Sequence, residues 1–265
     1  ESRGLGDVYK RQSEFLSPDI NKRTDEWGGS LENRTRIHVE IIKGIRKALG
    51  NDFPISLKLN SADFQKGGFS PADALESARI MESAGIDLLE ISGGTYEQPR
   101  LLGLDNLSIN PERSENRKSS SIAREAYFLD YAENIKKSIS IPTMVTGGFR
   151  TKDAMESSIK SNACQMIGVG RPLCADPQSI RKLLAGQIKE LSTYEKSLSL
   201  GPWILSPSSP FRLIQAINGF GTQAWCYQQI KRMARNEKPD LNMSMFSALK
   251  NDIRDDLASF KALKS

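Results

Sequence analysis

The pattern of apolar and polar positions becomes regular after Ser30. Ser30 suits a helix N-cap, Glu32 is an acid in the expected first turn, and Gly50 ends the pattern. Apolar residues recur on one helical stripe at Ile37, Ile41, Ile45 and Ala48, with Ile42 and Leu49 beside it. The sequence therefore predicts a helix between Ser30 and Gly50 that buries this stripe.

Beyond Gly50, short apolar runs alternate with helical patterns. Ser70, Pro71 and Asp73 are suited to open a helix, as a cap, a first-position proline and a third-position acid. The predicted strands are residues 54–60, 86–91, 141–146 and 164–169, and the predicted helices between them are residues 70–85, 122–138 and 152–160. Strands that alternate with helices in this way indicate βαβ units and a parallel sheet.

The tail at residues 178–265 lacks this strand rhythm. Helical patterns occur around residues 180–184, 211–217 and 223–235, and no shift in composition marks a separate domain. We therefore expect an α/β domain that continues into a helical extension.

The composition is that of an ordinary globular domain, with 38% hydrophobic and 26% charged residues. The formal net charge is only +5 and the basic residues are mixed with acidic ones, which favours solvated helix faces over a nucleic-acid surface. No apolar run is long enough to predict a membrane helix. Cys164, Cys174 and Cys226 show no C-x-x-C spacing, which argues against a disulfide framework or metal site and favours a reducing, cytoplasmic compartment.

Glycines follow the last two predicted strands. Gly147 and Gly148 follow one strand, and Gly170 and Arg171 follow the next. Glycine lets backbone N–H groups approach an anion, and a guanidinium can grip a phosphate with two hydrogen bonds. In a (β/α)8 barrel, a phosphate commonly binds the loops after the last two strands. This pattern predicts a phosphate ester as cofactor or substrate.

Two further charged or titratable residues have distinct predicted roles. Lys58 lies within an apolar strand, where an inward ammonium would need an anionic partner such as a reduced flavin. The alternative is that strand alternation places Lys58 in solvent. His38 is the only histidine and lies on the first predicted helix, so we expect a surface or packing role for it and no metal site.

Several segments together resemble the Old Yellow Enzyme family of flavin oxidoreductases. The most specific are residues 15–18 (FLSP) and 21–34 (NKRTDEWGGSLENR). The similarity continues through residues 58–60 (KLN), 89–94 (LEISGG), 146–148 (TGG) and 170–172 (GRP), and covers roughly residues 13–235. Arg23, Asp25 and Arg34 lie in this signature, and we expect them to serve as caps and ion pairs of a turn rather than in catalysis.

The resemblance implies a partial TIM (β/α)8 barrel. The four strands would be the fifth to eighth, residues 13–177 the C-terminal half of an FMN-binding barrel, and residues 178–265 an extension of that domain. Lys58 stands where the family usually has a flavin-contacting arginine. Gly147, Gly148, Gly170 and Arg171 match the region that binds the FMN phosphate, and no metal is implied.

The family also implies a reaction. NADH or NADPH reduces FMN, which passes hydride to a small α,β-unsaturated substrate while an acid protonates the neighbouring carbon. In relatives the substrate-binding pair and the proton donor lie just before the segment that matches residues 15–18. We expect these catalytic residues upstream of Ser13, so that the chain by itself is an inactive fragment. Residues 7–12 resemble a translated sequencing adapter, and we expect residues 1–12 to be non-native.

Two alternatives remain open at this point. A flavin barrel acting on RNA, such as a dihydrouridine synthase, would need a basic face and a cysteine acid. A non-catalytic half-barrel would instead pair with another chain through its two unpaired sheet edges. The resemblance implies no nucleic-acid or membrane partner, and the sequence does not specify an oligomeric state.

Overall fold

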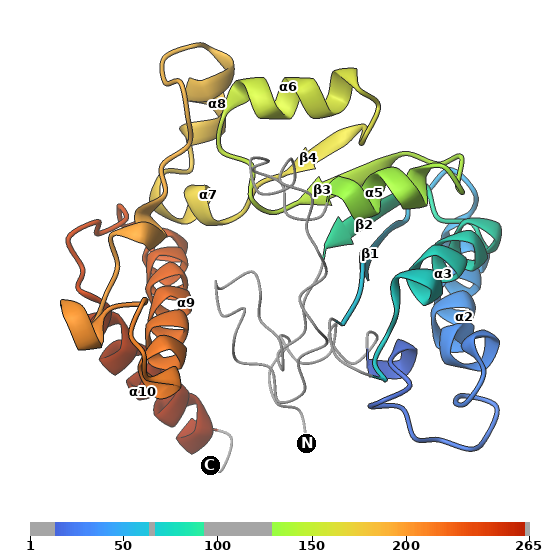
Figure 1. Ribbon diagram of the computed structural model, residues 1–265, viewed down its shortest axis with the longest axis horizontal. Coiled ribbons are helices and arrows are strands. Elements are labelled where there is room, and N and C mark those ends of the chain that lie inside the picture. The colour runs from blue at the N-terminus through green and yellow to red at the C-terminus, as the bar shows by residue number, and fades with distance from the viewer. Residues whose placement is uncertain (1–13, 64–66, 93–128, 263–265) are drawn as a thin grey trace. The chain divides into compact units, whose positions relative to one another are not determined.

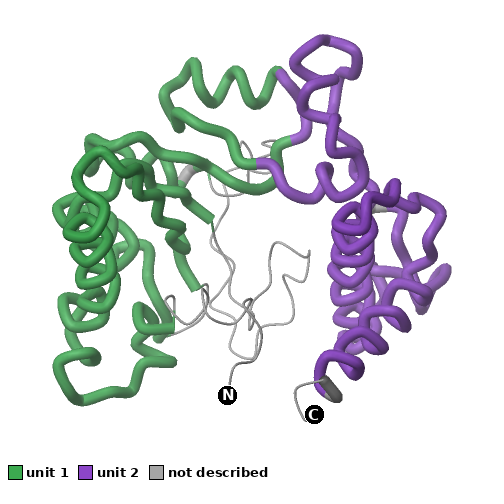
Figure 2. Tube along the Cα trace, turned by 180° about the vertical axis from the view of Figure 1, so that it is seen from behind, with its two compact units in different colours: residues 1–98, 108–149, 153–168 green, residues 99–107, 150–152, 169–265 purple. Residues whose placement is uncertain are grey.

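The computed structural model describes residues 14–63, 67–92 and 129–262. Within these ranges the chain forms two compact units, which Figure 2 colours separately. The first comprises residues 14–63, 67–92, 129–149 and 153–168, and the second comprises residues 150–152 and 169–262. The expected division of the chain after residue 177 stays a prediction.

Some expectations concern other parts of the chain. The non-native origin of residues 1–12, the long polar segment at residues 95–120 and the start of the helix expected at residues 122–138 lie outside the described residues. No helix of the described ranges is long and apolar enough to cross a membrane.

The first unit is a parallel sheet with helices against one side (Figure 1). Its elements are α2 (Leu31–Leu49), β1 (Ser56–Asn60), α3 (Pro71–Ala84), β2 (Leu88–Ser92), α5 (Leu129–Lys136), β3 (Thr143–Thr146), α6 (Lys152–Lys160) and β4 (Met166–Gly168). The four strands are parallel and lie in the order β1-β2-β3-β4. All four predicted strands are therefore confirmed, as are the three helices of this unit whose full predicted range is described.

The core lies on the helix side of the sheet. Leu59, Ile91 and Val145 are register partners on β1, β2 and β3, and none of the three is more than 2% exposed. Helices α3 and α5 pack against the strands on this side. Side chains alternate along a strand, so the residues between these positions face the opposite side.

Helix α2 begins and ends where the sequence predicts. The Ser30 hydroxyl accepts a hydrogen bond from the N–H of Asn33 at 3.3 Å, and Gly50 caps the other end with a φ of 84°. The predicted buried stripe is wrong. The buried residues of α2 are Arg34, Thr35, His38 and Ile42, whereas Ile41 of the predicted stripe is 40% exposed.

Polar partners explain this difference. The Thr35 hydroxyl donates to a backbone carbonyl of the preceding turn, and the Arg34 guanidinium reaches partners outside the helix, so both side chains are buried with their hydrogen bonds made. His38 is 4% exposed, which confirms the packing role among the two that we expected for it. Apolar periodicity alone does not reveal such a face.

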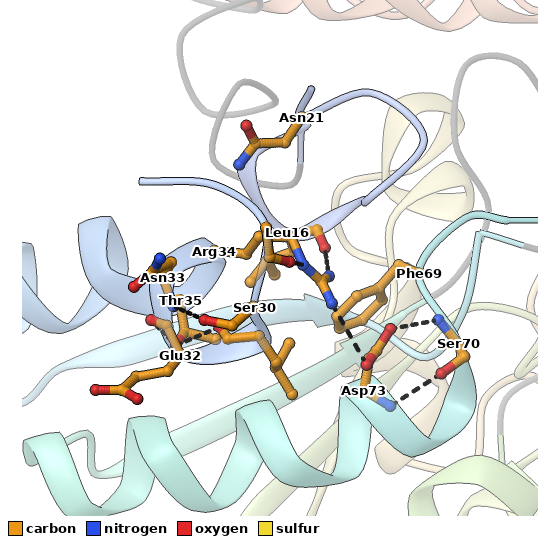
Figure 3. Close-up of polar contacts among 12 residues, drawn as sticks. Leu16, Asn21, Ser30, Glu32, Asn33, Arg34, Thr35, Phe69, Ser70 and Asp73 are labelled. Atoms are coloured by element: carbon orange, nitrogen blue, oxygen red, sulfur yellow. Dashed lines mark hydrogen bonds and ion pairs between the residues drawn. The ribbon is translucent and has the colours of Figure 1, made fainter. Parts of the chain in front are cut away.

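Arg34 joins three segments of the first unit (Figure 3). Its guanidinium donates to the carbonyl oxygens of Leu16 and Gly29, and its Nη2 lies 3.6 Å from the Asp73 carboxylate of α3. The Arg34 side chain is only 7% exposed. This contact fixes the signature segment and the start of α2 against the start of α3.

The start of α3 is a complete capping box. The Ser70 hydroxyl accepts from the N–H of Asp73 at 3.1 Å, and the Asp73 carboxylate accepts from the N–H of Ser70 at 3.3 Å. The sequence predicts this cap, and the structure confirms it.

Removing the Ser70 hydroxyl therefore has a measurable cost. The free energy of unfolding of the Ser70→Ala variant is expected to be about 1 kcal/mol lower than that of the wild type, since the N–H of Asp73 loses its acceptor. Ser157→Ala is the matched control, because Ser157 is exposed within α6 and alanine favours a helix interior. Urea denaturation of the full-length protein measures both, and an equal stability change in the two variants would contradict the role of the cap.

The second unit is helical. Its elements are α7 (Arg171–Ala175), α8 (Ser179–Leu184), the 3-10 turns η2 (Tyr194–Lys196) and η3 (Trp203–Leu205), α9 (Arg212–Ala234) and α10 (Met245–Ala262). The two patterns predicted at residues 211–217 and 223–235 are one helix, α9, so the predicted break between them is wrong. The sequence also gave no expectation of α10.

Glycine explains the wrong break. Gly219 and Gly221 interrupt the apolar pattern of α9, which reads as a helix end in a sequence. In the structure a Cβ on Gly221 would lie 2.5 Å from Met245, so this glycine allows α10 to approach α9 closely. The residue that signals a break in the sequence is therefore a packing residue in the fold.

Candidate functional site

The carboxyl ends of the four parallel strands bring small polar residues to one edge of the first unit. Asn60 at the end of β1 pairs in register with Ser92 at the end of β2, and Thr146 at the end of β3 pairs with Gly168 at the end of β4. Ser61, which follows β1, is 1% exposed and donates its N–H to the Ser92 carbonyl at 2.7 Å. In a (β/α)8 barrel this edge carries the chemistry.

Two hydroxyl oxygen atoms at this edge are buried without a hydrogen-bond partner among the described residues. They are the hydroxyl oxygens of Ser61 and Thr146. A buried hydroxyl usually has a partner, so each is available to a bound group or an ordered water molecule. The Thr146 hydroxyl directly precedes the glycine turn that the sequence singled out.

The turn after β3 requires glycine. Gly147 has a φ of 116° and Gly148 has a φ of 88°, a region that residues with a side chain rarely adopt. Next to it, a Cβ on Gly168 would lie 1.9 Å from the Thr146 hydroxyl oxygen. The Thr146 side chain therefore packs directly against the Gly168 backbone, where a larger residue would not fit.

Lys58 lies on the face of the sheet opposite the core. Its register partners across the sheet are Glu90, then Met144, then Met166. The Lys58 ammonium lies 2.5 Å from a Glu90 carboxylate oxygen, and the Lys58 side chain is 49% exposed. Sequence reasoning missed Glu90, although its signal is the same as that of Lys58: a charge within an apolar strand. The predicted contact of Lys58 with flavin stays a prediction.

The second unit contains the other predicted phosphate residues. Gly170 is the N-cap of α7, and a Cβ there would meet open space. Arg171 begins α7, with its Nη1 3.6 Å from the carboxylate of Glu195. The same carboxylate oxygen lies 2.5 Å from Nη2 of Arg150. Sequence reasoning missed Glu195 and Arg150, because only the fold brings them to Arg171.

This arginine cluster keeps a positive charge. Two guanidinium groups share one carboxylate, so Arg150, Arg171 and Glu195 carry a formal net charge of +1, from two cations and one anion. Each guanidinium has five N–H donors, more than a single carboxylate can use. The cluster is therefore chemically suited to a phosphate, and Gly170 and Arg171 follow Gly168 closely along the chain.

Arg23 and Asp25, which we expected to form an ion pair of a turn, make that contact in the structure. Arg23 forms an ion pair with Asp25, and the hydrogen bond from Arg23 holds the pKa of the Asp25 carboxyl below its ordinary value. An open cavity of about 440 Å³ lies beside this pair, lined by Phe15, Arg23, Trp27, Ile37, Glu40 and Ile41. The lining residues come from the segment before α2 and from α2 itself. Within the described ranges no cluster of three His, Cys, Asp or Glu side chains could hold a metal ion.

Helices on one side of a parallel sheet, with a glycine turn at its carboxyl edge, define the first unit as part of a (β/α)8 barrel. Residues 12–190 match the family described as the NADH:flavin oxidoreductase / NADH oxidase family. The chain belongs to this family, that of the Old Yellow Enzyme, whose members are enzymes. The family and the fold expected from the sequence are thus confirmed.

Individual relatives agree with this assignment. The NADH-dependent flavin oxidoreductase iccE of Talaromyces variabilis is 36% identical over 62% of this chain and 38% of its own length. The structure of 2-naphthoyl-CoA reductase in complex with 2-naphthoyl-CoA is 34% identical, with a TM-score of 0.56 over 68% of this chain and 26% of that one. An Old Yellow Enzyme homologue from Zymomonas mobilis, at 17% identity, shares the fold with a TM-score of 0.50 over 76% of this chain and 50% of its own. The chain therefore spans at most half the length of these proteins.

Proposed function

We propose that the full-length protein is an FMN-dependent ene-reductase, which uses NADH or NADPH to reduce a small α,β-unsaturated substrate. Membership of the family supports the flavin and the nicotinamide. The name of 2-naphthoyl-CoA reductase supports reduction of a conjugated carbonyl compound, because its ligand has a thioester carbonyl conjugated to an aromatic ring. The proposal applies to the full-length protein and not to these residues alone, since the chain spans a minor part of most relatives.

One observation carries the cofactor assignment. The Thr146 hydroxyl is buried without a described partner, directly before the Gly147–Gly148 turn at the carboxyl edge of the sheet. In the proposal the backbone N–H groups of this turn hold the FMN phosphate, a role that the family resemblance also gives to Gly170. Arg171 supplies charge-assisted hydrogen bonds to the same phosphate.

Bound FMN would supply the hydride-transfer chemistry, and the chain would hold and polarise the cofactor. We assign to Lys58 the positive charge beside the pyrimidine edge of the flavin, where negative charge gathers on reduction. Glu90 holds the Lys58 ammonium on the open face of the sheet, at 2.5 Å. Glu90 thus orients this cation, and it also competes with the flavin for it.

The proton donor and the substrate-binding pair belong to a different part of the proposal. His38 is the only histidine of the chain, and it is buried within α2. We assign the two catalytic functions to sequence upstream of Ser13, as the family resemblance implies. A cytoplasmic location is part of the same proposal, supported by three free cysteines.

The test is cofactor binding by the purified full-length protein. The wild-type protein is expected to show a flavin absorbance spectrum and to oxidise NADH or NADPH in the presence of an α,β-unsaturated carbonyl compound. Arg171→Leu is expected to raise the Kd for FMN at least about tenfold, because a hydrogen bond to a charged group contributes about 1.5–3 kcal/mol. Glu195 keeps its contact with Arg150 in this variant.

Arg181→Leu is the matched control, since Arg181 is an exposed residue of α8 in the same unit. Its Kd for FMN is expected to equal that of the wild type. Absence of flavin binding in the wild-type protein would overturn the proposed function. An unchanged Kd in Arg171→Leu would overturn the phosphate role of Arg171 alone.

A further inference from the structure

The second unit brings together two cysteines that are far apart in the sequence. Cys174 lies on α7 and Cys226 lies on α9, and these two helices pack against each other. Their neighbours in sequence, Ala175 and Trp225, are 5% and 1% exposed and belong to the same buried cluster, against which Cys226 also packs. This packing holds the two thiols at a fixed place in the fold.

The two thiols are in contact and are chemically unequal. A hydrogen bond from Cys226 lowers the pKa of Cys174 to about 7, and the same contact together with burial raises the pKa of Cys226. Arg171 and Glu195 both face the pair, and their charges act in opposite directions. Cys174 follows Arg171 by three residues on α7, so this guanidinium lies beside it and favours its thiolate, while Cys226 donates the proton of the pair.

We propose that Cys174 and Cys226 form an oxidisable dithiol, in which Cys174 reduces a small hydroperoxide and Cys226 completes an intramolecular disulfide. The Cys174 thiolate attacks the peroxide oxygen, the O–O bond breaks, and the products are a sulfenic acid and water or an alcohol. The Cys226 sulfur then attacks the sulfenic sulfur, and the S–O bond breaks. Hydroxide leaves with the Cys226 proton as water, so the two sulfurs together lose two electrons.

Accessibility distinguishes this pair from the third cysteine. Cys174 and Cys226 are both partly exposed, whereas Cys164 is fully buried in the first unit and burial raises its pKa. About half of Cys174 is thiolate at pH 7, against about 1% of a thiol with the ordinary pKa of 9.0. The lower basicity of that thiolate offsets part of this gain, which leaves a rate advantage of about fivefold.

The test uses hydrogen peroxide and the full-length protein at pH 7, with thiol titration and peptide mass spectrometry. Wild type and Cys164→Ser are both expected to form a link between the peptides of Cys174 and Cys226, with loss of two hydrogens. Thiol loss in Cys174→Ser is expected to be at least about fivefold slower. Cys226→Ser is expected to accumulate sulfenic and sulfinic acid on Cys174, because that sulfur has lost its resolving partner.

Other results would overturn the proposal. One is a wild-type protein that reacts no faster than Cys174→Ser. Another is the same oxidised product on Cys174 in wild type and in Cys226→Ser. A disulfide that joins two molecules would also contradict it. Far-UV circular dichroism of each serine variant confirms that the compared proteins are folded, and all variants are compared with the same flavin content.

Discussion

In the full-length protein, the Arg34→Leu substitution is expected to lower the free energy of unfolding by about 3 kcal/mol. Arg34 is 7% exposed and connects α2 to the carbonyls of Leu16 and Gly29 and to Asp73 (Figure 3). Leucine preserves the helix and the apolar contacts but leaves these acceptors without their donor. The Asp73 side chain is 23% exposed, so water can solvate its carboxylate in part once the guanidinium is gone. The expected loss of stability is therefore smaller than the largest losses seen when a fully buried ion pair is broken.

Arg79→Leu is the control for this variant. Arg79 lies on α3 with half of its side chain exposed, and it pairs with Glu76 one turn away at 3.3 Å. Such surface pairs contribute about 0–1 kcal/mol, so little change is expected. Urea denaturation with a common m-value compares the two variants. A similar loss in both would mean that Arg34 acts only as an ordinary surface residue.

The Gly168→Ala variant is expected to lose about 3 kcal/mol of stability or more, at the upper end of the overpacking range. The new Cβ would lie 1.9 Å from the Thr146 hydroxyl oxygen and 2.8 Å from its Cβ, so β3 and β4 cannot keep their register without a shift. Gly44→Ala is the control. Gly44 lies in α2 with nothing near its Cβ position, and alanine there is expected to stabilise by about 0.5–1 kcal/mol.

A second substitution tests whether the clash is the cause. Thr146→Ala removes the hydroxyl oxygen and the methyl group that lie nearest the new Cβ, but keeps the Thr146 Cβ. The double variant Thr146→Ala, Gly168→Ala is therefore expected to recover part of the lost stability relative to Gly168→Ala. Losses that simply add would show that the two residues do not interact.

The parts of the fold that the sequence predicts are those with local signals. Ser30, Gly50 and Ser70 act within one turn of their own position, so their caps are visible in the sequence and confirmed in the structure. The strands are predicted equally well, because apolar runs between glycines and prolines leave few alternatives.

The parts that could not be predicted depend on partners distant in the chain. Arg34 is buried because Leu16 and Asp73 provide its partners. A prediction from the apolar stripe alone therefore assigned the wrong face of α2 to the core. Glu195 reaches Arg171, and Cys226 reaches Cys174, through the packing of the second unit. Of the predicted site, the glycine turn has the backbone that the sequence implies, while the salt bridges of Lys58 and Arg171 emerged only from the fold.

The strand order of the sheet bears on how the protein is made. Among the described strands, β2, β3 and β4 each lie next to the strand that precedes them in the chain, so each finds its partner already synthesised. Loop closure is short between β1 and β2 and between β3 and β4, which favours rapid folding of these pairs. These four strands can therefore pair in the order of translation, each new strand adding to the edge of the strand before it.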